Sequence, residues 1–163
     1  GQIPIYYNYK NTGRPSIPAP NQVFWSHYID ETNDPLYEFG YGLSYTSFEY
    51  TNLKLSSRSF NSNSNIKASF TLTNTGEREG KEVVQMYIRD LFASVTRPVR
   101  ELKGFEMVSL KPGESKEVSF TIDKETIKFY SANNKWEAEV GDFKLFIGGS
   151  SNTTLEETFS YKK

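Results

Sequence analysis

The stretch Ile66-Lys67-Ala68-Ser69-Phe70-Thr71-Leu72-Thr73-Asn74-Thr75-Gly76 has the clearest pattern in the sequence and decides its fold class. Apolar side chains stand at every second position from Ile66 to Leu72, and polar side chains alternate with them. Alternate side chains of an extended strand point to opposite faces of a sheet, so this period predicts a strand with one buried face. Asn74-Thr75-Gly76 then brings turn-forming residues together, which ends the strand.

Strand patterns continue on both sides of this stretch. Upstream, the alternation of Phe48 and Tyr50 resumes one register out at Leu53, which predicts a β-bulge near Thr51-Asn52. Downstream, Glu82 to Asp90 has apolar side chains on both of its faces. Strands that are covered on both faces have this composition, so we expect this strand to be central.

The rest of the chain alternates strand patterns with turn residues. Lys111-Pro112-Gly113-Glu114 has Pro and Gly where a type II turn requires them. Asn133-Asn134 is predicted to turn a hairpin, and Asp123 to cap a single helical turn that ends at Lys128. Further strand patterns lie at 99–110, where Gly104 interrupts, at 118–122, at 143–147 and at 154–161.

Together these patterns predict an all-β fold with about seven to eight short strands, turn signals about every ten residues and almost no helix. This spacing is typical of an antiparallel immunoglobulin-like β-sandwich. The sequence contains no cysteine, which excludes the disulfide core of antibody domains and favours a fibronectin type III-like sandwich. Periodicity alone does not separate a sandwich from a closed barrel, so the barrel stays as the alternative.

The segment Pro35 to Tyr45, Pro-Leu-Tyr-Glu-Phe-Gly-Tyr-Gly-Leu-Ser-Tyr, divides the chain into two parts. Before it, prolines at 15, 18 and 20 hold the backbone extended and remove hydrogen-bond donors. We therefore expect residues 1–34 to form an extended leader that includes a short strand at 3–7, and residues 35–163 to form the sandwich. The aromatic residues and glycines of the segment predict a chain that turns sharply while burying rings.

Charge and composition narrow the classes of partner. The chain has 19 basic and 20 acidic residues, so no electrostatic reason exists to expect nucleic acid or an anionic membrane as a partner. The absence of cysteine excludes disulfides, thiolate metal sites and a thiol nucleophile. No apolar run approaches the roughly 20 residues of a membrane-spanning helix. Gly1-Gln2-Ile3-Pro4 resembles neither a signal peptide nor a natural start, so we expect a processed or excised piece.

No catalytic, cofactor or metal site is predicted from the residues. The single histidine, His27, has an aromatic context and no nucleophile motif beside it, which favours a packing role. Asp30 to Asp34 lacks the spacing of a calcium loop and is interpreted as a solvated turn. Gly40-Tyr41-Gly42 lacks the third glycine of a phosphate-binding loop. The carboxylate pairs are interpreted as solubilising charges on turns and edge strands; they are Glu77/Glu79, Glu137/Glu139 and Glu156/Glu157.

The two tryptophans are the natural platforms for stacking a sugar ring. Trp136 is flanked by the alternating Ala138 and Val140, so a core position is favoured for it. For Trp25, the sequence does not distinguish between a platform that stacks a ligand and a side chain that packs in an interface.

Several stretches, taken in order, cover nearly the whole chain. They are Ile3–Asn8, Thr12–Pro15, Pro35–Tyr45, Asn74–Gly76, Gly80–Tyr87, Arg97–Phe105, Leu110–Glu114, Val140–Phe143 and Ile147–Ser151. Together they resemble the C-terminal part of glycoside hydrolase family 3, the β-glucosidase and β-xylosidase family, and Pro35–Tyr45 is the most specific of them. The first two stretches resemble the end of the α/β sandwich domain of that family.

The resemblance implies that the chemistry lies outside this chain. In that family the nucleophilic aspartate belongs to an N-terminal barrel-type domain, in a Ser-Asp-Trp type motif, and the acid/base glutamate belongs to the following α/β sandwich domain. This chain contains no Asp-Trp pair, and the residues before Asn8 are too few to hold the acid/base loop. No catalytic residue is carried over, and residues 1–34 are expected to be a strand and linker from the preceding domain.

The leading hypothesis is a non-catalytic, C-terminal fragment of a secreted or periplasmic β-glucosidase, without a cofactor. Its role would be to pack on the preceding catalytic domains and stabilise them. The candidates for this inter-domain packing are Trp25, Phe39, Tyr41, Leu43 and Tyr45. Two rival hypotheses are a carbohydrate-binding module that uses Trp25 or exposed tyrosines, and a general adhesion or interaction sandwich.

Overall fold

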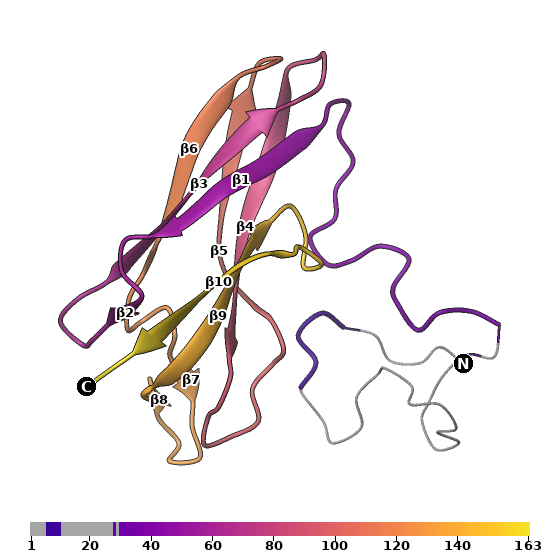
Figure 1. Ribbon diagram of the computed structural model, residues 1–163. Coiled ribbons are helices and arrows are strands. Elements are labelled where there is room, and N and C mark those ends of the chain that lie inside the picture. Colours follow the sequence, from indigo (N-terminus) through magenta and orange to yellow (C-terminus); the bar gives the residue numbers. More distant parts are fainter. Residues whose placement is uncertain (1–5, 11–27, 29) are drawn as a thin grey trace.

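Two sheets face each other in the computed structural model, which describes residues 6–10, 28 and 30–163 (Figure 1). One sheet has the strand order β1 (Phe48–Leu55), β3 (Ile66–Asn74), β6 (Ser115–Ile122). The other has the order β2 (Ser59–Phe60), β10 (Leu155–Tyr161), β9 (Gly141–Gly148), β4 (Gly80–Asp90), β5 (Glu101–Leu110). A separate hairpin joins β7 (Phe129–Tyr130) to β8 (Trp136–Glu137).

All long strands pair antiparallel, and only the short β2 runs parallel to its neighbour β10. No ladder joins the two sheets in the part of the chain that the structure describes. The predicted all-β sandwich is therefore confirmed, and the alternative of a closed barrel is excluded. No helix among residues 6–10, 28 and 30–163 is long and apolar enough to cross a membrane.

The core lies between the sheets and follows the period of two. Ile66, Ala68, Phe70 and Leu72 of β3 are all buried, as the alternation predicted. Side chains of β4, β6 and β9 complete one cluster with them. Full burial of a large apolar side chain such as Phe70 stabilises the fold by roughly 1.5–3 kcal/mol, so this shared face holds the two sheets together.

β4 is the central strand of its sheet, between β9 and β5, as expected. Five consecutive residues, 84–88, are buried. Val84, Met86 and Ile88 enter the core, so Gln85 and Tyr87 point to the outer face. The neighbouring strands β9 and β5 pair with the edges of β4 but do not cover its outer face. Since Gln85 and Tyr87 are nevertheless buried, other segments of the chain must cover them.

Most of the predicted turns are confirmed. The ladder of β1 and β3 shifts register between Thr51 and Lys54, and Asn52 has a positive φ of 56°. Gly113 has a φ of 71°, as a type II turn requires. Asn134, with a φ of 57°, turns the β7–β8 hairpin.

Two local predictions are wrong. Asp123 Oδ1 accepts hydrogen bonds from the Thr126 N–H (2.9 Å) and hydroxyl (2.8 Å), but the residues form a turn and no helix. The turn leads into the short strand β7, in which Phe129 is buried. Trp136 is 66% exposed, with its ring edge-on to Tyr130. These two residues pair across the hairpin, one position along from the buried Phe129, so the alternation turns Trp136 away from the core.

Asn74 joins three segments at the end of β3. Its side chain is fully buried, and Nδ2 donates to the carbonyl oxygens of Arg78 (2.7 Å) and Leu110 (3.0 Å). Oδ1 accepts from the Thr46 hydroxyl (2.6 Å) and the Gly76 N–H (3.1 Å). The Asn74 amide therefore forms four hydrogen bonds, which explains why an asparagine stands at the end of this strand.

Replacing Asn74 by alanine should lower the free energy of unfolding by about 2–4 kcal/mol, because the buried Leu110 carbonyl loses its donor and three further groups lose a partner. Urea denaturation of the purified chain measures this. The exposed Asn63 provides the control, and Asn63→Ala should change stability by no more than about 0.5 kcal/mol. Equal effects of the two substitutions would show that Asn74 does not join the segments as described.

Candidate functional site at the junction segment

The junction segment, residues 35–45, passes beside the β9–β10 loop on its way to β1; Figure 1 shows it in purple. It contains the predicted sharp turn, since the Tyr41 N–H donates to Glu38 O (3.0 Å). Gly40, the third residue of that turn, has a φ of 83°, a conformation that glycine adopts without strain. An added Cβ at Gly40 would lie 2.0 Å from Gln85 Oε1, so both the turn and the contact beneath it require glycine.

Gln85 anchors this turn to the sheet. Its Nε2 donates to Gly40 O (3.0 Å) and to Gly149 O (2.6 Å), and its Oε1 accepts from the Tyr87 hydroxyl (2.5 Å). The Ser151 N–H adds a bond to Phe39 O (2.8 Å). We call this set of contacts the Gln85 clasp, because it ties the junction segment, β4 and the β9–β10 loop together.

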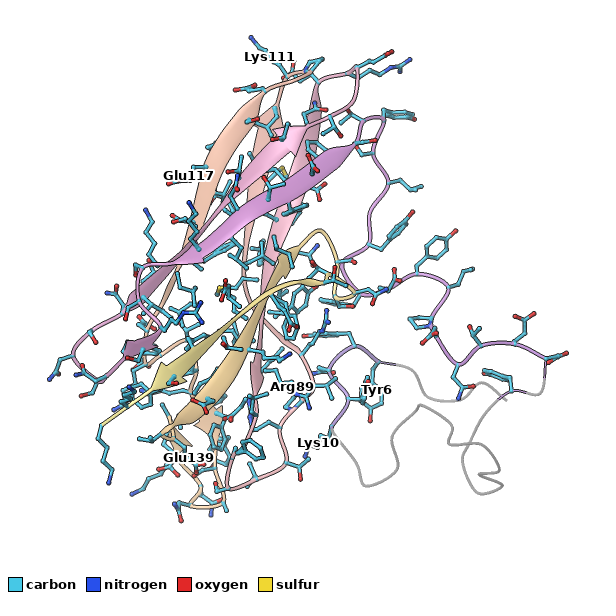
Figure 2. All side chains as sticks on the ribbon, viewed as in Figure 1. Tyr6, Lys10, Arg89, Lys111, Glu117 and Glu139 are labelled. Atoms are coloured by element: carbon cyan, nitrogen blue, oxygen red, sulfur yellow. The ribbon has the colours of Figure 1, made fainter. Side chains whose placement is uncertain are left out.

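The N-terminal residues 6–10 cover a further part of the outer face of the five-stranded sheet. The Tyr7 ring stacks on Phe39 with centroids 3.9 Å apart, and meets Tyr87 edge-on at 6.1 Å. Lys10, labelled in Figure 2, forms an isolated bridge with Pro98 in the β4–β5 connection. Of the strand predicted at residues 3–7, positions 3–5 lie outside the described residues, and positions 6 and 7 are not in a strand.

Tyr87 remains a neutral hydrogen-bond donor at ordinary pH. Burial is the main reason that its pKa rises to about 12, with the charge of Tyr7 adding to the rise and that of Arg100 opposing it. Burial also lowers the pKa of Arg100. The Arg100 guanidinium lies 4.1 Å from the centre of the Phe146 ring and donates to Thr153 O (2.8 Å) and Ser151 O.

The predicted packing candidates fall into two groups. Phe39 and Tyr41 are 45% and 49% exposed, and each has a ring partner: Tyr7 for Phe39, and Tyr37 at 5.3 Å for Tyr41. Leu43 and Tyr45 are 90% and 91% exposed. Since Tyr37, Phe39 and Tyr41 are exposed as well, the expectation that this segment buries its rings is wrong. Trp25 lies outside the described residues. Whether these side chains pack on another domain stays a prediction.

Sequence reasoning missed two exposed apolar side chains of β5. Phe105 and Met107 are 69% and 63% exposed. They lie opposite Gln85 and Val83 of β4 in the ladder, so they extend the outer face on which the junction segment lies. Apolar residues occur on both faces of this strand, and the sequence pattern could not say which face a neighbour covers.

A cleft of about 540 Å³ lies between the junction segment and the sheet. At its base the Tyr50 hydroxyl donates to Glu82 Oε1 (2.7 Å), and burial raises the pKa of both groups. Gly149 lines it too, and an added Cβ there would lie 2.5 Å from Glu82 Oε1. Its lining residues are Glu38, Gly40, Tyr41, Gly42, Leu43, Ser44, Tyr50, Lys81, Glu82, Val83, Gly148, Gly149, Ser150, Asn152 and Thr153.

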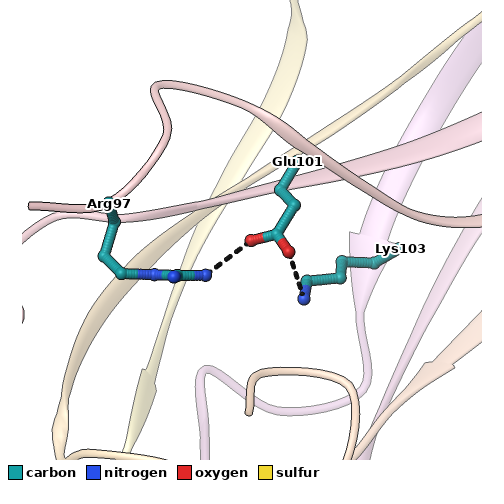
Figure 3. Close-up of polar contacts among 3 residues, drawn as sticks. All are labelled: Arg97, Glu101 and Lys103. Carbon is teal, nitrogen blue, oxygen red and sulfur yellow. Dashed lines mark hydrogen bonds and ion pairs between the residues drawn. The ribbon is translucent and has the colours of Figure 1, made fainter. Parts of the chain in front are cut away.

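Other charged groups pair with one another and hold loops. Glu101 accepts from Arg97 (2.7 Å) and Lys103 (2.9 Å), as Figure 3 shows. Arg97 also lies over the Phe129 ring at 4.5 Å, which ties the β4–β5 connection to β7. Within the described ranges, no group of three or more His, Cys, Asp or Glu side chains could hold a metal ion.

A family model described as a fibronectin type III-like domain matches residues 82–151. A periplasmic β-glucosidase of Salmonella typhimurium is 50% identical over 98% of this chain and 21% of its own length. A putative β-xylosidase of Formosa agariphila is 44% identical over 100% of this chain and 20% of its own length. The crystal structure of a β-glucosidase from Listeria innocua in complex with glucose has a TM-score of 0.87 at 39% identity, over 99% of this chain and 22% of that one. This chain thus spans about one fifth of the length of these relatives.

Gly40→Ala should destabilise the chain by about 1–3 kcal/mol, because it forces a side chain into a left-handed conformation and into Gln85. Gly42→Ala is the matched control, since its φ is not positive and an added Cβ meets nothing within 4 Å. We expect that control to change stability by less than about 1 kcal/mol. Thermal and urea denaturation of both variants measure the difference, and equal stabilities would contradict the clasp.

The pKa of Tyr87 also predicts a dependence on pH. The folded value of about 12 lies above the ordinary 10.0 of an unfolded chain. Its contribution to stability is therefore complete below about pH 10 and is lost as the pH rises toward about 12. Urea midpoints should fall between about pH 9 and pH 11.5, and Tyr87→Phe should make this fall shallower, with Tyr50 still contributing. An unchanged slope in the variant would contradict the assignment.

Proposed function

Because this chain corresponds to the C-terminal, fibronectin type III-like region of glycoside hydrolase family 3 enzymes, we propose that it is the structural domain of a longer β-glucosidase. Its role is to pack on the catalytic part of that enzyme and stabilise it. The observation that carries this proposal is a match over nearly the whole chain to proteins about five times as long. Terminal β-linked sugars are the proposed substrates of the longer enzyme, and this chain contributes no catalytic residue.

Exposed apolar side chains give the proposal its physical basis. Leu43 and Tyr45 project from the junction segment almost fully into solvent. Transfer of apolar surface out of water is worth about 25 cal/mol per Å², and large exposed apolar patches commonly mark interaction sites. We assign the main packing contact to Leu43 and Tyr45, with Phe39 and Tyr41 at its border and Trp25 as a further candidate.

The Gln85 clasp supports the same role in a second way. It fixes the junction segment on the sandwich, so a domain that precedes the junction would be held in one direction relative to the sheets. In this proposal, residues 1–34 connect to that domain and residues 35–163 form the sandwich. A secreted or periplasmic location is proposed with it, on the support of the periplasmic relative.

The test uses the longer enzyme that carries this chain. The double substitution Leu43→Ser and Tyr45→Ser should shorten the half-life of its β-glucosidase activity at elevated temperature several-fold, because apolar contacts between domains are lost. The same substitutions in the isolated chain should change its free energy of unfolding by less than about 0.5 kcal/mol, because both side chains are exposed there.

Trp136→Ser provides the matched control, since Trp136 is an exposed aromatic on the separate β7–β8 hairpin. It should leave the half-life unchanged. The isolated chain should show no turnover of an aryl β-glucoside. An unchanged half-life in the double variant, or turnover by the rigorously purified chain, would overturn the proposal.

A further inference from the structure

The cleft beside the junction segment has the chemistry of a ligand site that the structural role does not explain. We propose that it binds an uncharged, polyhydroxylated ligand, namely a short stretch of a saccharide chain. Its volume of about 540 Å³ lies within the range of roughly 300–1,000 Å³ that is usual for ligand sites. This binding would be additional to packing between domains, and the cleft shares Tyr41 and Leu43 with the proposed packing contact.

Tyr41 supplies an aromatic surface on one wall. Its side chain is 49% exposed, and the Tyr37 ring lies 5.3 Å away, tilted by 32°. An exposed tyrosine ring offers an apolar face together with a hydroxyl. The apolar face of a sugar ring fits such a surface, while its hydroxyls remain free for polar contacts.

Both hydrogen-bond donors and hydrogen-bond acceptors line the remaining walls of the cleft. The Tyr50 hydroxyl holds Glu82 in place through Oε1, and Asn152 Nδ2 holds Glu38 Oε1 (3.0 Å). Lys81 adds a donor to these acceptors. The carboxylate oxygens that are fixed in this way can accept strong, charge-assisted hydrogen bonds from a neutral ligand.

The composition of the walls selects among ligand classes. Two carboxylates in the lining, those of Glu38 and Glu82, would repel an anionic ligand. Among the described residues, no group of side chains could hold a metal ion. Sugar hydroxyls donate and accept, which matches a wall that mixes carboxylates, an amide and an ammonium group. Gly148 and Gly149 line the cleft without side chains of their own, which lets Thr153 and Glu82 lie close against the loop backbone.

Affinity electrophoresis of the whole chain tests this proposal with named polymers. Native gels contain soluble mixed-linkage β-glucan, soluble xylan or dextran. We expect β-glucan or xylan to retard the chain. Tyr41→Ala should weaken that binding by about tenfold, because the stacking surface is lost. Glu82→Gln should weaken it less, because the shape of the side chain is kept and only its charge is lost.

Trp136→Ala is the control for unspecific stacking, because Trp136 is an exposed aromatic that does not line the cleft. It should bind as the wild type does, and unchanged thermal unfolding should show that every variant is folded. If none of the polymers retards the chain, the proposal is overturned. It is also overturned if Trp136→Ala weakens polymer binding while Tyr41→Ala does not. If the free chain binds no polymer while hydrogen exchange shows that residues 40–44 become protected in the longer enzyme, a protein segment occupies the cleft and the saccharide proposal fails. The half-life test of the structural role does not depend on any of these results.

Discussion

A single buried amide, that of Gln85, controls how the outer face of the larger sheet is closed. Gln85 lies on the central strand β4 and points away from the core, into a place that water hardly reaches. A buried amide without partners would cost about 1–3 kcal/mol, and the carbonyls of Gly40 and Gly149 provide those partners. The sandwich is therefore complete only when the junction segment lies across it, and Gly40 is the residue that allows this approach.

The two faces of this sheet consequently have different functions. Its inner face forms a self-contained apolar core with β3 and β6, which is sufficient to hold the sandwich together. Its outer face has the clasp and the exposed Phe105, and the junction segment that lies on it adds the exposed Leu43 and Tyr45 and borders a polar cleft. Charged groups elsewhere, for example Glu101 with its two cations, are paired and hold loops. We therefore expect binding and packing to involve the junction segment and the face on which it lies.

The sequence pattern correctly predicted those features of the fold that depend on a few neighbouring residues. The burial of alternate residues in β3, the bulge at Asn52 and the turn at Gly113 all follow from period and from backbone preference. Prediction failed at Trp136, which pairs with the exposed Tyr130 on the outward side of a hairpin whose other side buries Phe129. The resemblance to family 3 glycoside hydrolases marked the stretches around Gly40, Asn74 and Gly149 without giving their reasons. Those reasons are contacts between residues far apart in the chain, and a pattern along one segment cannot contain them.

The central claim is that the Gln85 clasp makes the junction segment a fixed part of the sandwich, and amide hydrogen exchange tests it most directly. The Ser151 N–H, bonded to Phe39 O, and the Tyr41 N–H, bonded to Glu38 O, report on this closure. We predict slow exchange of both amides in the wild type. In Gln85→Ala both should exchange at least about tenfold faster, while the amides of β3 keep their protection. Fast exchange in the wild type, or equal rates in the variant, would contradict the account.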